Sequence, residues 1–118
     1  MFLIGLHQYQ ATIAAGQSLS GPVPTGADTP VGIWMPPAWT AAGLTFQVSP
    51  DGGSTWLDLY DGTGVEVSFV AGANQFIWLT SYMWRGINMV QVRSGTLAAP
   101  VAQAAGAVVT LIARPEIV

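Results

Sequence analysis

Apolar and polar residues alternate along much of this chain with a period of two. Leu44, Phe46 and Val48 are apolar and the residues between them are polar, and the same alternation runs over residues 65–69. Because successive side chains of a β-strand point to opposite faces, this pattern predicts strands with one buried face. Similar patterns predict further strands over residues 9–14, 31–35, 56–60, 75–79, 87–93 and 107–113, with a weaker candidate over residues 18–23.

Turn sequences such as "DGG", "DGTG", "AGAN" and "MPP" separate these segments. No segment has a convincing helical stripe of apolar residues, although residues 98–106 could hold one short turn. Many short strands joined by glycine-rich turns are typical of sandwiches and small barrels. The predicted fold is therefore all-β, a small β-sandwich of jelly-roll or immunoglobulin-like type with about eight strands.

The N-terminal segment differs in composition from the rest of the chain. It is rich in Gly, Ser, Thr and Pro, as in "AAGQSLSGPVPTGADTP", and it contains a single charged residue. We expect residues 1–30 to form an extended N-terminal arm or edge element that is able to reach a neighbouring subunit. Residues 31–118 are expected to form the sandwich domain.

Charged residues are scarce. They make up 8% of the chain, where an ordinary domain has roughly a quarter, and the basic residues are Arg85, Arg93 and Arg114 alone. So few charges cannot cover the surface of a small monomer, which indicates that a partner covers part of it, most simply in a homo-oligomer. The net charge of −3 argues against binding to nucleic acid, which requires clustered Lys and Arg.

A membrane span and a signal peptide are both disfavoured. Residues 94–113 carry no charge and are numerous enough to cross a bilayer as a helix, but Pro100, Gln103 and Gly106 interrupt them, and "AVVTLIA" is typical of a buried strand. The N-terminal "MFLIGLHQYQ" lacks the basic start and the long apolar run of a signal peptide.

The stretch "SPDGGSTW" fits S-x-D-x-G-x-T-W, the Asp-box signature found in sialidases and other secreted glycosidases. A chain of 118 residues is too short for a multi-bladed propeller, so a whole sialidase is excluded. The same residues explain a turn: an Asp can accept backbone N–H bonds, and a Gly can adopt a positive φ. We predict a structural turn made by Ser49, Asp51, Gly53, Thr55 and Trp56.

Four carboxylates, Asp51, Asp58, Asp61 and Glu66, lie close together in the sequence. A glycosidase pair formed by Asp58 with Asp61 or Glu66 is one interpretation, and a calcium site is another. The simpler interpretation is favoured: Asp61 belongs to a turn, and Asp58 and Glu66 lie on the solvent side of their strands. No metal site is predicted.

The sequence has few of the residue types that nucleophilic catalysis uses. His7 is the only histidine, and the chain has no cysteine and no lysine. A nucleophile and base would have to be built from a serine and this one residue near the terminus. We therefore predict no catalytic residue, no cofactor and no enzymatic activity.

Tryptophan is abundant, and aromatic rings can stack on sugars. The candidates for such a platform are Trp34, Trp39, Trp56, Trp78 and Trp84 with Tyr60 and Tyr82. In a small sandwich, most large aromatic side chains are core residues or interface anchors. Carbohydrate binding is therefore kept as the alternative function, as a carbohydrate-binding module or a tail- or fibre-associated adhesion protein.

Two stretches of the chain resemble a known group of proteins. "MPPAWTAAGLTFQVSPDG" and the pattern "VRSGT-x-A-x-P-V-x-Q" are similar to small β-rich structural proteins encoded by tailed bacteriophages and prophages, and the resemblance covers roughly residues 31–115. It implies a virion component such as a head decoration or cement protein, and it implies no enzymatic activity. The run "FIWLTSYMWRGINM" is richer in Trp and Met than is typical of the group, which indicates an apolar surface particular to this chain.

These observations lead to one expected function. The chain is expected to be a non-enzymatic bacteriophage structural protein, a capsid cement or decoration protein that binds the shell of the major capsid protein and stabilises it. We expect a homo-oligomer, with a trimer as one form, located on the capsid surface of the virion and in the host cytoplasm during assembly. No nucleic acid or membrane partner is expected.

Overall fold

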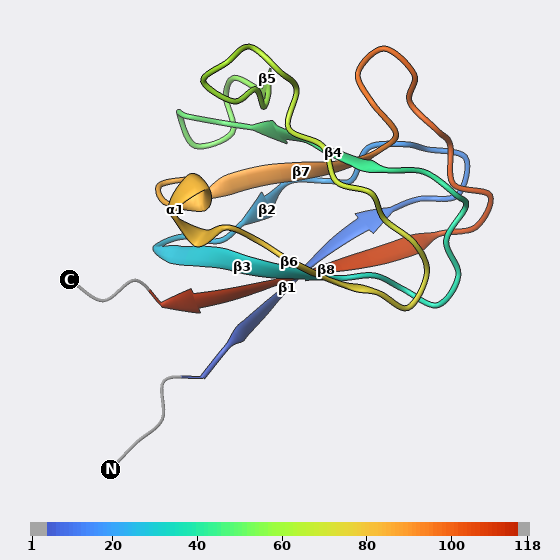
Figure 1. The fold of residues 1–118 in the computed structure, drawn as a ribbon, viewed down its shortest axis with the longest axis horizontal. Coiled ribbons are helices and arrows are strands. Elements are labelled where there is room, and N and C mark those ends of the chain that lie inside the picture. Colours follow the sequence, from blue (N-terminus) through green and yellow to red (C-terminus); the bar gives the residue numbers. More distant parts are fainter. Residues whose placement is uncertain (1–4, 116–118) are drawn as a thin grey trace.

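The computed structural model describes residues 5–115 apart from the side chains of Ser81 and Tyr82; residues 1–4, which begin the predicted arm, and residues 116–118 lie outside it. The described chain is a sandwich of two four-stranded antiparallel sheets, seen edge-on in Figure 1. This confirms the predicted all-β sandwich. The strands are β1 (His7–Ile13), β2 (Val23–Pro24), β3 (Asp28–Trp34), β4 (Leu44–Val48), β5 (Leu57–Asp58), β6 (Phe76–Trp78), β7 (Met89–Ser94) and β8 (Ala107–Pro115).

The strands pair as if the chain were one long hairpin. β1 pairs with β8, β2 with β7, β3 with β6 and β4 with β5, all antiparallel. Further pairing of β3 with β8 and of β4 with β7 rolls this hairpin into two layers. The first sheet has the order β1-β8-β3-β6 and the second β2-β7-β4-β5. This is the order of an eight-stranded jelly roll, one of the two sandwich types that the sequence predicts.

The core lies between the two layers and contains the apolar face that alternation predicts. Leu44 and Phe46 of β4 are fully buried. The Phe46 ring meets the buried Trp84 ring edge-on at a centroid distance of 5.0 Å, and it meets Phe69 in the same way at 5.7 Å. Edge-to-face packing aligns the positive edge of one ring with the negative face of another, so this aromatic cluster joins β4 to the segments that carry Phe69 and Trp84.

The predicted strand over residues 65–69 is not a strand in the structure, and of the weaker candidate over residues 18–23 only Val23 belongs to a strand, β2. Residues 65–69 make only isolated bridges, between Tyr60 and Glu66 and between Leu44 and Phe69. The side-chain alternation is nevertheless present, since Val65 is exposed while Val67 and Phe69 pack against the core. The neighbouring β5 has only two residues, so there is no extended edge for this segment to pair with.

The N-terminal segment is part of the sandwich. Its described residues supply β1 and β2, and the predicted boundary at residue 30 falls inside β3. Ala11, Ile13 and Val23 are buried. β1 occupies the edge of its sheet, where it pairs with β8 of the same chain along its whole length. The physical reason is that the small and β-branched residues of this segment alternate well enough to bury one face.

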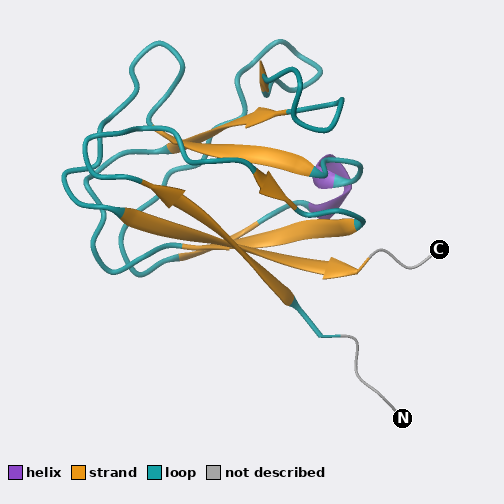
Figure 2. Ribbon diagram, turned by 180° about the vertical axis from the view of Figure 1, so that it is seen from behind, coloured by secondary structure: helices purple, strands orange, loops and turns teal. Residues whose placement is uncertain are grey.

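Helical structure is minor in the described residues. One four-residue helix, α1 (Ser81–Trp84), lies at one end of the sandwich, as seen from behind in Figure 2. Residues 98–106 contain no helix. Over residues 5–115, no helix is long and apolar enough to span a membrane. The uncharged residues 94–113 form the end of β7, a loop and most of β8.

Gln103, the last residue of the pattern "VRSGT-x-A-x-P-V-x-Q", holds the loop between β7 and β8 in place by hydrogen bonds. Its side chain is buried, and its Oε1 accepts a hydrogen bond from the Thr40 N–H at 2.8 Å. Its Nε2 donates to the Thr40 carbonyl at 3.0 Å and to Ser94 Oγ at 2.7 Å. Its backbone also bonds to Gly16 and Gln17. One side chain thus connects three segments that are distant in sequence.

Gln103→Ala should destabilise the fold strongly. The change removes three side-chain hydrogen bonds and leaves the partly buried backbone groups of Thr40 without those partners, at a cost of about 2–4 kcal/mol in the free energy of unfolding. Urea unfolding followed by tryptophan fluorescence measures this. Gln17→Ala is the matched control, because that side chain is exposed and its loss should change stability by less than about 0.5 kcal/mol. Equal stability of the two variants would contradict the assigned role.

Candidate functional site

The Asp-box residues form the turn between β4 and β5. Asp51 Oδ1 accepts hydrogen bonds from Ser49 Oγ at 2.9 Å and from the Thr55 N–H at 2.8 Å. Ser49 Oγ in turn accepts from the Gly53 N–H at 2.7 Å, and Trp56 Nε1 donates to the Gly53 carbonyl at 3.1 Å. These polar groups therefore bond within the turn itself.

The backbone angles of two glycines and the pKa of Asp51 also reflect the geometry of the Asp-box turn. Gly52 has a φ of 75° and Gly53 a φ of 103°, in the left-handed region where a side chain is strained. Hydrogen bonds from the side chain and the N–H of Thr55 and from Ser49 hold the pKa of the Asp51 carboxyl below its ordinary value. The carboxylate is thus kept ionised as an acceptor for the turn, which is a structural role.

Asp58 and Glu66 converge on Arg93. Arg93 Nη2 lies 2.6 Å from Asp58 Oδ1, and Nη1 lies 3.3 Å from Glu66 Oε2. The Arg93 side chain is 7% exposed, and those of Asp58 and Glu66 are 22% and 18% exposed. The prediction that both carboxylates are solvated is therefore wrong. Pairing of β4 with β5 and β7 brings them over an arginine 35 and 27 positions away in sequence, which alternation within one strand does not reveal.

The cluster contains further hydrogen bonds. Arg93 Nη1 donates to Thr45 Oγ1 at 3.3 Å, and Glu66 Oε2 accepts from the Leu97 N–H at 3.1 Å. The hydrogen bond from Arg93 holds the pKa of the Asp58 carboxyl below its ordinary value, although burial acts in the opposite direction. Both carboxylates are thus paired with Arg93 within the fold.

Asp61 and His7 also have structural partners. Asp61 Oδ1 accepts from the Thr63 N–H at 2.8 Å and from the Val65 N–H at 3.1 Å, which closes a turn. His7 Nδ1 lies 2.6 Å from Asp28 Oδ2, and the same oxygen accepts a hydrogen bond from the Tyr9 hydroxyl. These bonds lower the pKa of Asp28, the one from Tyr9 contributing most, and Asp28 raises the pKa of Tyr9. This cluster ties β1 to the start of β3.

The carboxylates and the histidine therefore serve separate structural clusters. Over residues 5–115, no group of three or more His, Cys, Asp or Glu side chains is placed to hold a metal ion. The four predicted carboxylates are divided among two turns and the Arg93 cluster.

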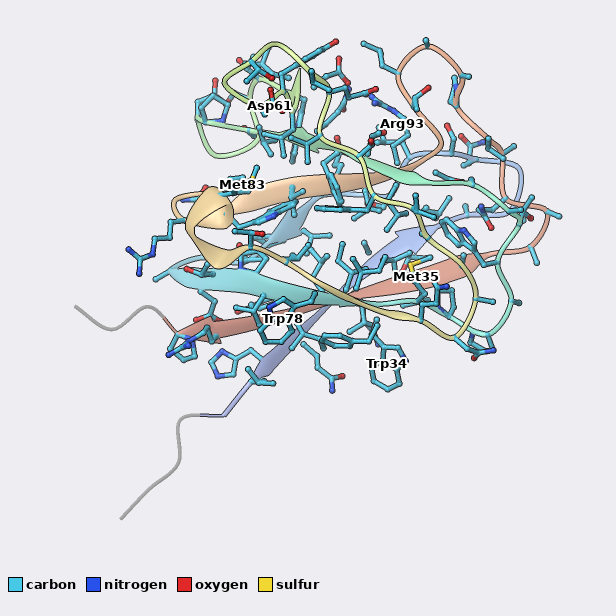
Figure 3. The ribbon with its side chains drawn as sticks, in the orientation of Figure 1. Trp34, Met35, Asp61, Trp78, Met83 and Arg93 are labelled. Carbon is cyan, nitrogen blue, oxygen red and sulfur yellow. The ribbon has the colours of Figure 1, made fainter. Side chains whose placement is uncertain are left out.

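The tryptophans differ in how far their side chains are exposed. Trp84 is buried in the core. Trp39 and Trp56 are partly buried, and each donates its indole N–H to a backbone carbonyl close by in sequence. Trp34 and Trp78 are 52% and 77% exposed on the outside of the first sheet, and Figure 3 labels both, with Trp34 below the strands.

We call Trp34, Phe76 and Trp78 the aromatic face. Phe76, which is 54% exposed, was missed among the aromatic candidates in the sequence, although it shares the strand parity of Trp78. The register opposes Trp34 to Phe76 and Gly32 to Trp78. The Phe76 ring lies over Gly32, where an added Cβ would stand 2.2 Å from a ring carbon. The glycine therefore lets the ring cover β3.

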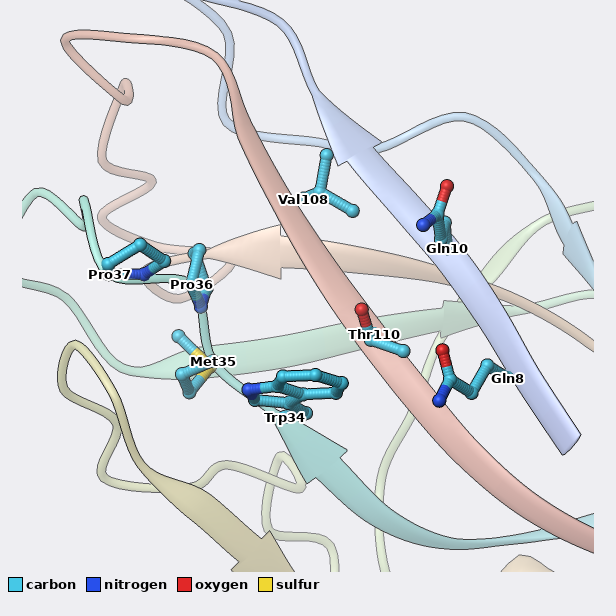
Figure 4. Close-up of a pocket in the computed structure, with 8 residues that line it drawn as sticks. All are labelled: Gln8, Gln10, Trp34, Met35, Pro36, Pro37, Val108 and Thr110. Carbon is cyan, nitrogen blue, oxygen red and sulfur yellow. The ribbon is translucent and has the colours of Figure 1, made fainter. Parts of the chain in front are cut away.

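A hollow of about 330 Å³ lies beside Trp34 at one end of the aromatic face. Figure 4 shows Gln8 and Gln10 of β1, Thr110 of β8 and Trp34 of β3 on the same side of the sheet. The register places Gln10, Thr110 and Trp34 in one row across three strands. The amides of Gln8 and Gln10 make no side-chain hydrogen bond to another described residue, and no residue that lines the hollow is charged.

A second hollow, of about 430 Å³, lies on the other side of the face, next to Phe76 and Trp78. The apolar residues Ile112 and Leu6 and the basic residue Arg114 are among those that line it. The outside of the first sheet is thus an exposed aromatic strip between two shallow hollows. Exposed apolar patches of this kind mark binding surfaces.

Comparison of the chain with protein-family models, curated proteins and solved structures gives no match.

Arg93→Met should destabilise the protein at neutral pH. It removes the cation from two partly buried carboxylates, which should cost about 2–4 kcal/mol. Because the folded pKa of Asp58 is depressed, this stabilisation is present above its unfolded pKa of about 3.9 and is lost as the pH falls through the folded value. Urea unfolding at pH 7 and pH 3 measures the difference between wild type and variant, which should shrink at pH 3. Arg114→Met, at an exposed site, is the control.

Proposed function

We propose that this chain is a non-enzymatic structural protein of a tailed-bacteriophage virion. In this proposal it is a capsid cement or decoration protein that binds the outer surface of the major capsid protein shell and stabilises it. It acts on the capsid surface after assembly in the host cytoplasm. The single observation that supports this most is the aromatic face, which stays exposed in a chain with very few charges.

The energetics of the aromatic face fit a docking role. Burying a large apolar side chain contributes about 1.5–3 kcal/mol, so three rings offer a substantial part of a binding energy. Aromatic residues are enriched among the residues that dominate protein interfaces. Many copies on one shell add to this through multivalency.

The polar groups support the same proposal. His7, Asp51, Asp58, Asp61 and Glu66 each bond to structural partners, so no acid, base or nucleophile set is proposed. Arg93 is engaged within the fold and contributes little to the outer charge. Docking by this protein therefore relies on apolar contact and backbone pairing.

Capsid retention tests the proposal. The double variant Trp34→Ala and Trp78→Ala should reduce the amount of protein bound to capsids of the encoding phage by about tenfold or more, since about 1.4 kcal/mol corresponds to a factor of ten. Leu57→Ala is the control: Leu57 is similarly exposed, at 53%, but belongs to the other sheet. Sedimentation followed by quantitative mass spectrometry measures bound protein.

Salt provides an independent arm of the same experiment. A wash in roughly 1 M NaCl screens exposed charges over a few ångströms but does not weaken apolar burial, so the wild-type protein should stay on the particle. Release by salt alone, with the tryptophan variant still bound, would overturn the proposal. Absence of the protein from purified virions would do the same.

A second candidate function, carbohydrate binding, is favoured by the hollow beside Trp34. An exposed indole can stack on a sugar ring, while the amides of Gln8 and Gln10, which bond to no side chain among residues 5–115, can donate to and accept from its hydroxyl groups. The lack of charge around this hollow suits a neutral glycan. Such binding would suit adhesion by a virion as well as a separate carbohydrate-binding module.

The glycan candidate makes its own prediction. Binding on a glycan array should be detectable for the wild type and lost in Trp34→Ala, while Trp34→Phe should retain part of it because a ring remains. Tyr60→Ala, which removes an exposed aromatic ring outside the aromatic face, is the matched control. If no glycan binds the wild type at millimolar concentration by calorimetry, this candidate is lost and the capsid proposal is unaffected.

A further inference from the structure

The free edge of β1 is the longest unprotected strand edge in the described sandwich. β1 has seven residues and pairs with β8 on one side only. On its other side, no described residue makes a hydrogen bond to the backbone of residues 7–13. A row of backbone N–H and C=O groups is thus available to another strand.

The other strands at sheet edges are short. β6 has three residues, and β2 and β5 have two each, with Pro24 in β2. Proteins protect long edges with charged residues, prolines or bulges. β1, with the sequence HQYQATI, has none of Asp, Glu, Lys, Arg or Pro, and its register against β8 runs without a bulge. Its edge has the features of a pairing surface.

We propose that β1 pairs antiparallel with β1 of a second copy of this chain, about a two-fold axis at Gln10. The pleat of the sheet limits the possible registers. Gln8, Gln10 and Thr12 are exposed on the outer face, while Ala11 and Ile13 are buried on the inner face. Outer positions of one copy lie opposite outer positions of the other only if some residue lies directly opposite its own copy across the axis. Gln10 is the middle residue of β1, so this axis pairs all seven residues.

The side chains that this register brings together are complementary. Gln10 faces Gln10 of the second copy, and two amides can each donate and accept a hydrogen bond. Tyr9, a large residue, faces the small Ala11 of the second copy. Gln8 faces Thr12 of the second copy, and no pair of like charges arises. About six to eight ladder hydrogen bonds would form along the shared edge.

The resulting dimer has one continuous eight-stranded sheet, with both aromatic faces on the same side. Two copies of the face in one plane would strengthen binding to any repetitive surface. The proposed dimer does not rest on the proposed function, because it depends only on the β1 edge. Failure of capsid binding would leave it untouched.

A charge exchange at Gln10 tests the axis. The purified full chain should have the mass of a dimer by light scattering and native mass spectrometry. Gln10→Lys and Gln10→Glu should each weaken dimerisation by about fivefold or more, because like charges lie directly opposite across the axis. Mixing the two variants in equal amounts should restore a mixed dimer. Thr12→Lys is the matched control: its partner is Gln8 of the second copy, so wild-type dimerisation should persist.

Cysteine cross-linking tests the register directly, since the chain has no cysteine of its own. Gln10→Cys should oxidise to a covalent dimer, whereas Thr12→Cys should not, because its two copies would be about 13 Å apart along the strands. The proposal would be overturned if the wild-type chain stayed monomeric up to a concentration of roughly 100 μM. A trimeric mass would also overturn it, as would cross-linking of Thr12→Cys as fast as that of Gln10→Cys. Circular dichroism and melting of every variant establish that the fold is intact.

Discussion

β8 pairs with a strand on each of its sides, and this double pairing holds the first sheet together. β8 joins β1 and β3, which are far apart from it in sequence, and its nine residues form the longest strand. The register across these three strands aligns Gln10, Thr110 and Trp34 in one row. It therefore sets the outer face, the hollow beside Trp34 and the open edge of β1 together. A slip of one residue would turn every side chain of a strand to the other face.

The second sheet has a different role. Its strands carry the Asp-box turn and the Arg93 cluster, and both use charged groups within the fold. A chain with few charges thus commits one of its three arginines, and at least two of its carboxylates, to an internal cluster. Little charge is left to decide specificity at the surface. The proposed docking therefore draws on shape, aromatic contact and backbone pairing.

The Asp-box and the "VRSGT-x-A-x-P-V-x-Q" pattern have the same kind of structural explanation. Polar side chains, Ser49 and Asp51 in the first and Gln103 in the second, bond to backbone groups that the loops would otherwise leave without these partners. Such motifs stabilise loops on many folds and carry no reaction of their own. The exposed aromatic face lies elsewhere, on strands whose outer residues belong to neither motif.

The fold class and most strands can be predicted from the sequence, because the period of two in residues such as Leu44, Phe46 and Val48 is a local consequence of strand geometry. The same holds for the Asp-box turn, whose hydrogen bonds span only a few residues. The tertiary structure alone decided the jelly-roll strand order, the partners of Arg93 and the convergence of Trp34 with Phe76 and Trp78. These depend on contacts between segments distant in sequence, and local alternation holds no information about which strand becomes the neighbour of another.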